Sequence, residues 1–171
     1  MNILQEMSPV QTLGGTDLEL NLANELRVPK REVRADVTFL YAPERPQQCL
    51  FFLNHYSPRS SGEESLAEHL NSGQAFFPLR DKSSGEFFIV HVHQILYVRE
   101  AQAQERSRRL PMSLHLEGGT VLHVFTFEPR HAWRSRPIDL LNDPERFIAF
   151  ALSGPGRIHV NKRHIARVEG L

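Results

Sequence analysis

The stretch DLLNDPERFIAFALSGPGRIHVNKRHIARV, residues 139–168, decides the fold because the chain contains its pattern twice. The earlier copy is EHLNSGQAFFPLRDKSSGEFFIVHVHQILYV, residues 68–98. Apolar side chains recur in the same order at positions 71 or 70 residues apart: Leu70 and Leu141, Phe76 and Phe147, Val90 and Val160, Ile95 and Ile165. A shared pattern of this length indicates a duplicated module.

The repeat also provides an internal control. Apolar positions that survive between two otherwise different copies are expected to be fixed by packing, so these eight side chains are the predicted core residues. A residue found in only one copy is not needed to make the fold.

Alternation of apolar and polar residues predicts short strands through most of the chain. In the first half we expect strands at residues 18–22, 33–41, 49–53, 75–79, 87–92 and 95–99, with a helical turn at 66–70. Pro43 and Pro46 are expected to end the strand at 33–41. In the second half we expect strands at 112–116, 121–127, 147–152, 157–160 and 164–168, with a helical turn at 138–142.

Runs of about five short strands with tight turns predict an all-β protein of two small five-stranded barrels in tandem, because closure removes exposed strand edges. The predicted organisation is an arm at 1–17, a first barrel at 18–100, a linker at 101–109 and a second barrel at 110–171. A small barrel buries little surface alone. We therefore expect the two to pack face to face or through a shared edge.

Composition narrows the class of protein. Twenty Lys and Arg balance twenty Asp and Glu, which disfavours a dedicated nucleic-acid binder because phosphate contacts usually require a basic surplus. The single cysteine, Cys49, lies in an apolar run and is expected in the core rather than as a nucleophile. No signal peptide or membrane span is evident. We expect a soluble, cytoplasmic protein without membrane insertion.

The second half resembles a bacterial domain family of unknown function. The family's signature is an Asp-Leu-Leu-Asn turn followed by a Val-Asn-Lys-x-x-Ile ending, matched here by residues 139–142 and 160–165. The first half carries a degraded copy that has lost the Asn-Lys pair. The strand order is similar to that of Sm-like and SH3-like small barrels. In Sm-like proteins a Lys-His ending can contact RNA, and the resemblance implies Lys162 and His164 as the candidates.

Paired polar residues are the first site candidates. Asn71 and Asn142 occupy the same place in both copies, where a short amide adopts a left-handed conformation or binds backbone groups. His91 and His93 are two apart in a predicted strand and so share one face. Their counterparts in the second copy are Asn161 and Arg163, which favours surface residues over a zinc site.

Two further segments carry possible binding chemistry. Residues 81–85, DKSSG, are similar to part of the cyclic-dinucleotide motif of PilZ domains but are one residue short, and a turn explains them. Three arginines in the linker form one basic cluster. In the loop 130–136, the only tryptophan, Trp133, is flanked by three more arginines, Arg130, Arg134 and Arg136. Trp and Arg are enriched at protein-interface hot spots, and they also stack on bases.

The sequence predicts a non-catalytic binding or scaffolding protein in a bacterial regulatory assembly, acting through protein–protein contacts. Its expected surface is the loop 130–136 with the neighbouring His91 and His93. The first alternative is an RNA- or DNA-binding tandem barrel, and the second is a PilZ-like cyclic-dinucleotide sensor. We expect no catalytic residues, metal or cofactor, since no nucleophile, base or phosphate loop shows the required spacing. Self-association of the chain stays open.

Overall fold

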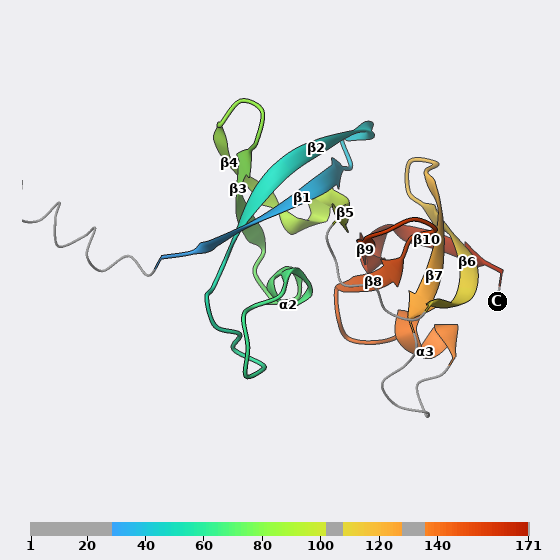
Figure 1. Ribbon diagram of the computed structural model, residues 1–171. Helices are drawn as coiled ribbons and strands as arrows, with labels where there is room; N and C mark the ends of the chain where they lie inside the picture. Colours follow the sequence, from blue (N-terminus) through green and yellow to red (C-terminus); the bar gives the residue numbers. More distant parts are fainter. Residues whose placement is uncertain (1–28, 102–107, 128–135, 171) are drawn as a thin grey trace, which may run out of the picture.

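The described part of the chain is a single antiparallel sheet. The computed structural model describes residues 29–101, 108–127 and 136–170, with the side chains of Arg108 and Arg109 left aside. These residues form a ten-stranded sheet in the order β10-β6-β7-β8-β9-β5-β1-β2-β3-β4 (Figure 1). The predicted all-β class is confirmed. None of the helices in this part of the chain is long and apolar enough to cross a membrane.

The two halves have the same succession of elements. The first contains β1 (Arg31–Phe39), β2 (Ala42–Leu53), α2 (Leu66–Leu70), β3 (Phe76–Asp81), β4 (Phe87–His91), the 3-10 turn η1 (Val92–Gln94) and β5 (Ile95–Glu100). The second contains β6 (Arg108–Leu116), β7 (Val121–Phe127), α3 (Pro137–Leu141), β8 (Phe147–Ala151), β9 (Arg157–Asn161), the 3-10 turn η3 (Lys162–His164) and β10 (Ile165–Glu169). The predicted strand at 18–22 and the arm lie outside the described residues, as does most of the linker.

Strand order and register repeat as well. The first half has the order β5-β1-β2-β3-β4 and the second has β10-β6-β7-β8-β9. Phe76 faces His91 across β3 and β4, and Phe147 faces Asn161 across β8 and β9. The residue pairs that the repeat aligned therefore occupy equivalent places in the two halves.

The prediction that Pro43 and Pro46 end the strand at 33–41 is wrong, because β1 already ends at Phe39 and both prolines lie in the next strand. β2 begins at Ala42 and runs through both prolines. Its register with β1 passes from Phe39 opposite Ala42 to Val37 opposite Gln47, so both prolines fall within an irregularity. Proline lacks a backbone N–H, and a bulge is where a strand tolerates that loss.

The halves are joined by pairing between β9 and β5. Tyr97 lies opposite Val160 and Glu100 lies opposite Arg157. Because successive side chains point to opposite faces, Val98 enters the core of the first half while Tyr97 packs against the core of the second. The two cores therefore lie on opposite faces of one continuous sheet. Of the two expected arrangements, the shared edge is the one present.

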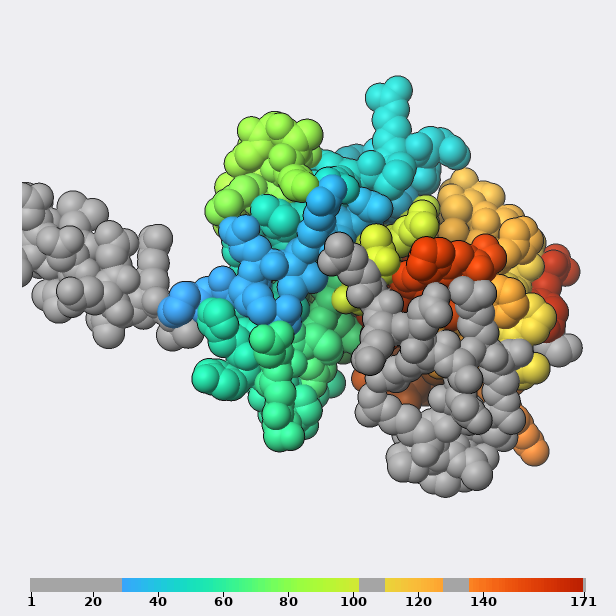
Figure 2. Space-filling view, in the orientation of Figure 1, coloured from blue at the N-terminus to red at the C-terminus, as the bar shows by residue number. Residues whose placement is uncertain are grey.

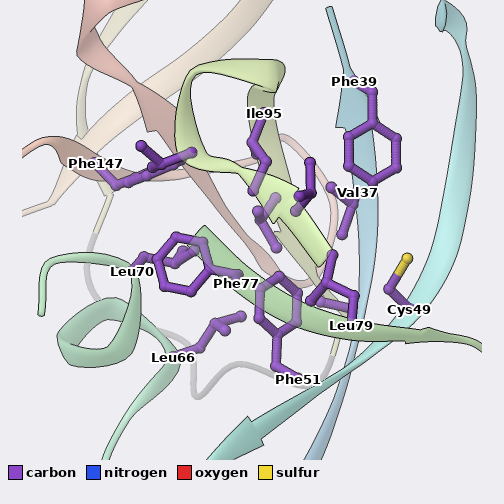
Figure 3. Packing of buried hydrophobic residues seen from close by; sticks show 14 of the residues in the cluster. Val37, Phe39, Cys49, Phe51, Leu66, Leu70, Phe77, Leu79, Ile95 and Phe147 are labelled. Carbon is purple, nitrogen blue, oxygen red and sulfur yellow. The ribbon is translucent and has the colours of Figure 1, made fainter. Parts of the chain in front are cut away.

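Each half has its own apolar core, but one side chain crosses between them. Phe147 belongs to β8 in the second half, yet it is buried in the core of the first half. Figure 3 shows it on the side of that core where Leu70 and Ile95 lie. The first core therefore needs a residue of the second half to be complete.

Five of the eight predicted core residues are buried: Leu70, Val90, Ile95, Phe147 and Val160. The prediction is wrong for Phe76, which is 56% exposed while its neighbour Phe77 fills the core. Leu141 and Ile165 are only partly buried against the second core. Phe76 belongs to β3 and Ile165 to β10, near the two ends of the described sheet, and Leu141 is the last residue of α3.

Phe147→Ala and Phe76→Ala should lower the free energy of unfolding by very different amounts, although the two residues occupy equivalent positions. Phe147→Ala should lower the free energy of unfolding by about 3–5 kcal/mol, because it leaves a cavity in the first core. Phe76→Ala should cost less than about 1 kcal/mol, because the ring is largely exposed. Urea unfolding of the two variants and the wild-type chain measures both values. Equal losses would contradict the structure.

Trypsin should cut first within residues 101–109, which contain Arg106, Arg108 and Arg109 between two packed halves. The two fragments should nevertheless elute together in gel filtration, because β9 remains paired with β5 and Phe147 remains in the first core. They should separate only in denaturant. Separation in native buffer would show that the pairing is too weak to join the halves.

Candidate functional site

An exposed apolar surface lies on the outer face of the β3–β4 hairpin. Along β3 and β4, alternate residues enter the core, among them Phe77, Leu79 and Val90. The intervening side chains point outward, and two of them, Phe87 and Ile89, are 55% and 70% exposed. Together with Phe76 they form what we name the hairpin surface: Phe76, Phe87, Ile89 and His91. Figure 2 shows this hairpin, in green, at the outer end of the first half.

Aromatic stacking holds one end of the hairpin surface in place. Phe87 stacks on Phe52 of β2 with the ring centroids 5.1 Å apart. The guanidinium group of Arg80 lies 5.4 Å from the Phe52 ring and 5.7 Å from the Phe87 ring. Glu32 forms an ion pair with the same guanidinium group at 3.2 Å. A surface ordered in this way loses little side-chain entropy when it binds a partner.

The two predicted histidines lie at the other end of the hairpin surface. The Phe76 and His91 rings are 4.8 Å apart, and the His91 and His93 rings are 4.5 Å apart. His93 does not lie in the strand, as predicted, but in η1, where its backbone N–H donates to His91 Nδ1 at 3.3 Å. Partial burial and the charge of Arg163 lower the pKa of His93. His91 thus has a structural role, because its Nδ1 accepts the backbone N–H that begins η1.

The equivalent surface of the second half is covered by the first half. Phe147, His159 and Asn161 correspond to Phe76, Ile89 and His91, and all three are buried. His159 Nε2 donates to Glu100 Oε2 at 3.2 Å, and this bond lowers the pKa of Glu100. The chain therefore contains one covered and one open version of the same surface.

Asparagines make the polar contacts of this covered surface. Asn71 Nδ2 donates to the Phe147 carbonyl oxygen at 3.0 Å, and its Oδ1 accepts the Phe147 N–H at 2.8 Å. Asn161 Nδ2 donates to the carbonyl oxygens of Val92 and Ile95 at 3.1 and 3.0 Å. Asn71 and Asn142 have φ of −100° and −90°. The left-handed conformation is therefore wrong for both, and the predicted backbone binding is confirmed for Asn71.

The remaining predicted binding residues are dispersed. Arg130, Trp133 and Arg134 lie outside the described residues. Arg136 is exposed at the start of α3, where its backbone N–H donates to Asp139 Oδ2 at 3.3 Å.

Lys162 and His164, the candidates for an RNA contact, serve the fold. Lys162 Nζ donates to the carbonyl oxygen of Asp143. His164 is buried, with Nδ1 bonded to Glu117 at 2.7 Å and Nε2 bonded to the His93 carbonyl oxygen at 2.9 Å. Neither of its ring nitrogens is left for an external ligand.

The segment 81–85 is a turn between β3 and β4. The Asp81 carboxylate accepts bonds from the Ser83 hydroxyl at 2.5 Å and from the Ser84 N–H at 2.9 Å. Chiefly the bond from the Ser83 hydroxyl lowers the pKa of Asp81. Gly85 has φ of 73°, which only glycine adopts without strain. The turn accounts for every residue type that made the segment similar to a cyclic-dinucleotide motif.

Three ionisable side chains, Cys49, Glu64 and His69, are buried in the first half. Burial raises the pKa of the Cys49 thiol to about 12, which leaves it protonated and inert as a nucleophile. His69 Nδ1 lies 3.3 Å from Glu64 Oε1, and both side chains are buried. Burial lowers the pKa of His69. Leu140 occupies the position of His69 in the second half, so the fold itself does not require this pair.

A shallow hollow lies between α2 and the start of β8, lined by Arg59, Asn71, Gly73, Pro144, Glu145 and Arg146. Its two guanidinium groups are already bonded: Arg59 donates to the Asn71 carbonyl oxygen and Arg146 donates to the Gln74 carbonyl oxygen. Within the described ranges, no three His, Cys, Asp or Glu side chains gather as metal ligands. The hairpin surface is therefore the strongest candidate for recognition.

Comparison with models of known protein families, with characterised proteins and with solved structures finds no match to this chain. The candidate site is therefore identified from the geometry of the structure. Sequence reasoning missed Phe87 and Ile89, although a signal was present. Residues 87–90, FFIV, are apolar at every position, which is typical of a strand covered on both faces.

His69 should make stability depend on pH. Above about pH 6.5 the ring is neutral in both the folded and the unfolded chain. As the pH falls through that value, the unfolded chain takes up a proton that the folded chain resists, so stability decreases. The free energy of unfolding of wild type minus that of His69→Leu should therefore decrease as the pH is lowered from about 7.5 to about 5. A constant difference in urea unfolding would refute the lowered pKa.

Proposed function

We propose that the chain is a non-catalytic binding or scaffolding protein that acts through protein–protein contacts. The observation that carries the proposal is the hairpin surface: two phenylalanines and an isoleucine, each more than half exposed, lie together on β3 and β4. Exposed apolar side chains that gather in one place mark interaction sites, whereas single ones need no explanation. Aromatic side chains are also enriched at the centre of interfaces.

The backbone next to this surface supports the proposal. Among the described strands, β4 pairs only with β3, so it is one edge of the sheet. Natural edge strands are usually protected by charges, prolines or bulges, and β4 reads FFIVH. An unprotected apolar edge is suited to the addition of a strand from a partner protein.

We further propose that the two halves are Sm-like or SH3-like small barrels in tandem and that the protein works in a cytoplasmic bacterial regulatory assembly. The identical strand order of the halves and their separate cores support the tandem barrels. The loop 130–136 with Trp133 is proposed as a second contact region.

Nucleic-acid binding is the second candidate function, favoured by one observation. The Arg80 guanidinium group lies against the stacked rings of Phe52 and Phe87. Nucleic-acid bases stack on aromatic and guanidinium groups of this kind. The formal net charge of zero weighs against it, since phosphate contacts need a basic surface.

Polar substitution on the hairpin surface should weaken partner binding. Proteins captured by the tagged wild-type chain would be identified, purified and titrated against wild type, Phe87→Ser/Ile89→Ser and the control Val121→Ser. Val121 is 43% exposed on β7, away from the hairpin. The double variant should weaken binding at least tenfold, a value that a pair of hot-spot residues exceeds, and the control should not.

Two outcomes would count against protein binding. A partner that binds wild type and the double variant equally would remove the hairpin surface from the proposed function. Retention of nucleic acid through purification, with affinity that falls steeply as salt increases, would favour the second candidate.

A further inference from the structure

We propose that residues 18–28 of the same chain dock on the hairpin surface, so that a protein partner must displace them in order to bind. This inference rests on the proposed function, because it adds a competitor for the same surface. Residues 18–28 precede the described part of the chain, and we name them the leucine segment.

The leucine segment has one apolar side. Its sequence is LELNLANELRV, in which every even-numbered position except Asn24 is leucine or valine, and every odd-numbered position is polar or alanine. Alternation with a period of two predicts an extended segment whose apolar side packs against another surface. Leu18, Leu20 and Leu22 are the side chains that such a surface must accept.

The spacing of the outward side chains on β4 matches that of the leucines. Phe87, Ile89 and His91 project from one face at every second residue. They are therefore about 6.6 Å apart along the strand, and leucines at every second position of an extended segment have the same spacing. A segment laid along β4 can place one leucine beside each outward residue. Leu20 is then beside Ile89, whichever direction the segment runs.

The chain enters the sheet close to this surface. β1, β2, β3 and β4 are consecutive antiparallel neighbours, so β1 begins at the end of the sheet where β3 begins and β4 ends. Arg31 therefore lies at the same end as Phe76 and His91, three strand spacings, or about 14 Å, from β4. Residues 23–30 span up to about 26 Å when extended. The leucine segment can thus reach the hairpin surface of its own molecule.

The short connection makes a weak contact sufficient. Tethering holds the leucine segment at an effective concentration in the millimolar range around the hairpin surface. A contact too weak to form between separate molecules at micromolar concentration is therefore occupied within one molecule. The same weakness allows a partner with more contacts to take the place of the segment.

Net charge favours docking of the N-terminal residues on the rest of the chain. Residues 1–28 contain four of the twenty acidic side chains and one of the twenty basic ones, which is a formal net charge of −3. Residues 29–171 contain the other sixteen acidic and nineteen basic side chains, which is a formal net charge of +3. Opposite charges of this kind speed the encounter of two surfaces and favour their contact.

Positive groups lie beside the Phe76 end of the hairpin surface. Arg163 Nη1 is 3.4 Å from His93 Nε2, and Arg146 Nη1 donates to the Gln74 carbonyl oxygen at 2.8 Å. Neither guanidinium group has a carboxylate partner among the described residues. The acidic side chains of the N-terminal residues are therefore attracted to the end of the surface where the chain enters the sheet.

Disulfide formation within one chain tests the contact on the full-length protein. Leu20→Cys/Ile89→Cys should form an intramolecular disulfide on air oxidation, detected by peptide mapping of the monomer. Two control variants, Glu19→Cys/Ile89→Cys and Leu20→Cys/Val121→Cys, should form it at least tenfold more slowly. Glu19 lies on the polar side of the segment, and Val121 is exposed on β7, away from the hairpin. Cys49 is buried and does not compete.

Two results of the oxidation would overturn the inference. Equal rates in all three variants would show that the segment reaches many surfaces and docks on none of them. A product that is chiefly a disulfide-linked dimer of about twice 19.6 kDa would show that the segment binds a second copy instead of its own molecule.

Dye binding tests whether the leucine segment covers the hairpin surface. The probe is anilinonaphthalene sulfonate, which fluoresces on exposed apolar surface. Leu20→Ser/Leu22→Ser should raise the fluorescence at least twofold, and the control Glu19→Ser/Asn21→Ser should not. Addition of Ile89→Ser to the leucine variant should remove the increase, with unfolding curves as a check that each variant is folded. Unchanged fluorescence in the leucine variant would overturn the inference.

Partner affinity tests the competition. The partner purified for the titration of the hairpin variants should bind Leu20→Ser/Leu22→Ser at least threefold more tightly than wild type. Equal affinities would overturn the competition. The proposed function fails separately: a partner that ignores Phe87→Ser/Ile89→Ser would remove its surface, whereas the disulfide within one chain would still form.

Discussion

Pairing between β9 and β5 is the interaction on which the rest of the structure depends. It joins two sheets of five strands into one, and it places their cores on opposite faces. A unit of some 70 residues buries a modest share of its surface and is marginal alone. Sharing an edge removes two exposed strands at once and covers the outer face of β8 and β9. Each half therefore uses the other to complete its packing: Phe147 enters the first core, and Tyr97 packs against the second.

Side chains at this junction couple the halves more tightly than backbone pairing alone. Phe147 brings apolar area from the second half into the first core, where its contacts are those of an interior residue. Asn71 holds the backbone of the same residue through both of its amide atoms. Buried polar groups that are fully bonded fix one arrangement, because any shift leaves them unsatisfied. Asn71 and Asn161, which bonds the carbonyl oxygens of Val92 and Ile95, thus fix the register, and Phe147 adds apolar burial.

The repeat predicted a large part of this architecture. Together with apolar–polar alternation it predicted the all-β class, the helical turns and most strands, and the repeat itself predicted five of eight core residues, because packing preserves apolar spacing. It was wrong for Phe76 because equivalent sequence positions need not have equivalent neighbours: Phe147 meets another half, and Phe76 meets none. The signal for the hairpin surface was the run of four apolar residues at 87–90, but such a run does not show whether the second face of the strand is covered within the chain. The irregularity that admits Pro43 and Pro46 depends on pairing with β1, which is not a local property.

Duplication itself explains why an apolar surface remains open. In a protein built from two copies joined head to tail, one copy of each complementary surface is used at the junction, and one of each is left over. The leftover surfaces here are the β3–β4 hairpin and the α3–β10 end, and they keep apolar residues such as Ile89 and Ile138 exposed. Charges on β4 would have prevented further pairing at little cost. Their absence, while the linker carries three arginines and the turn 81–86 carries several charges, supports the proposal that this surface serves recognition.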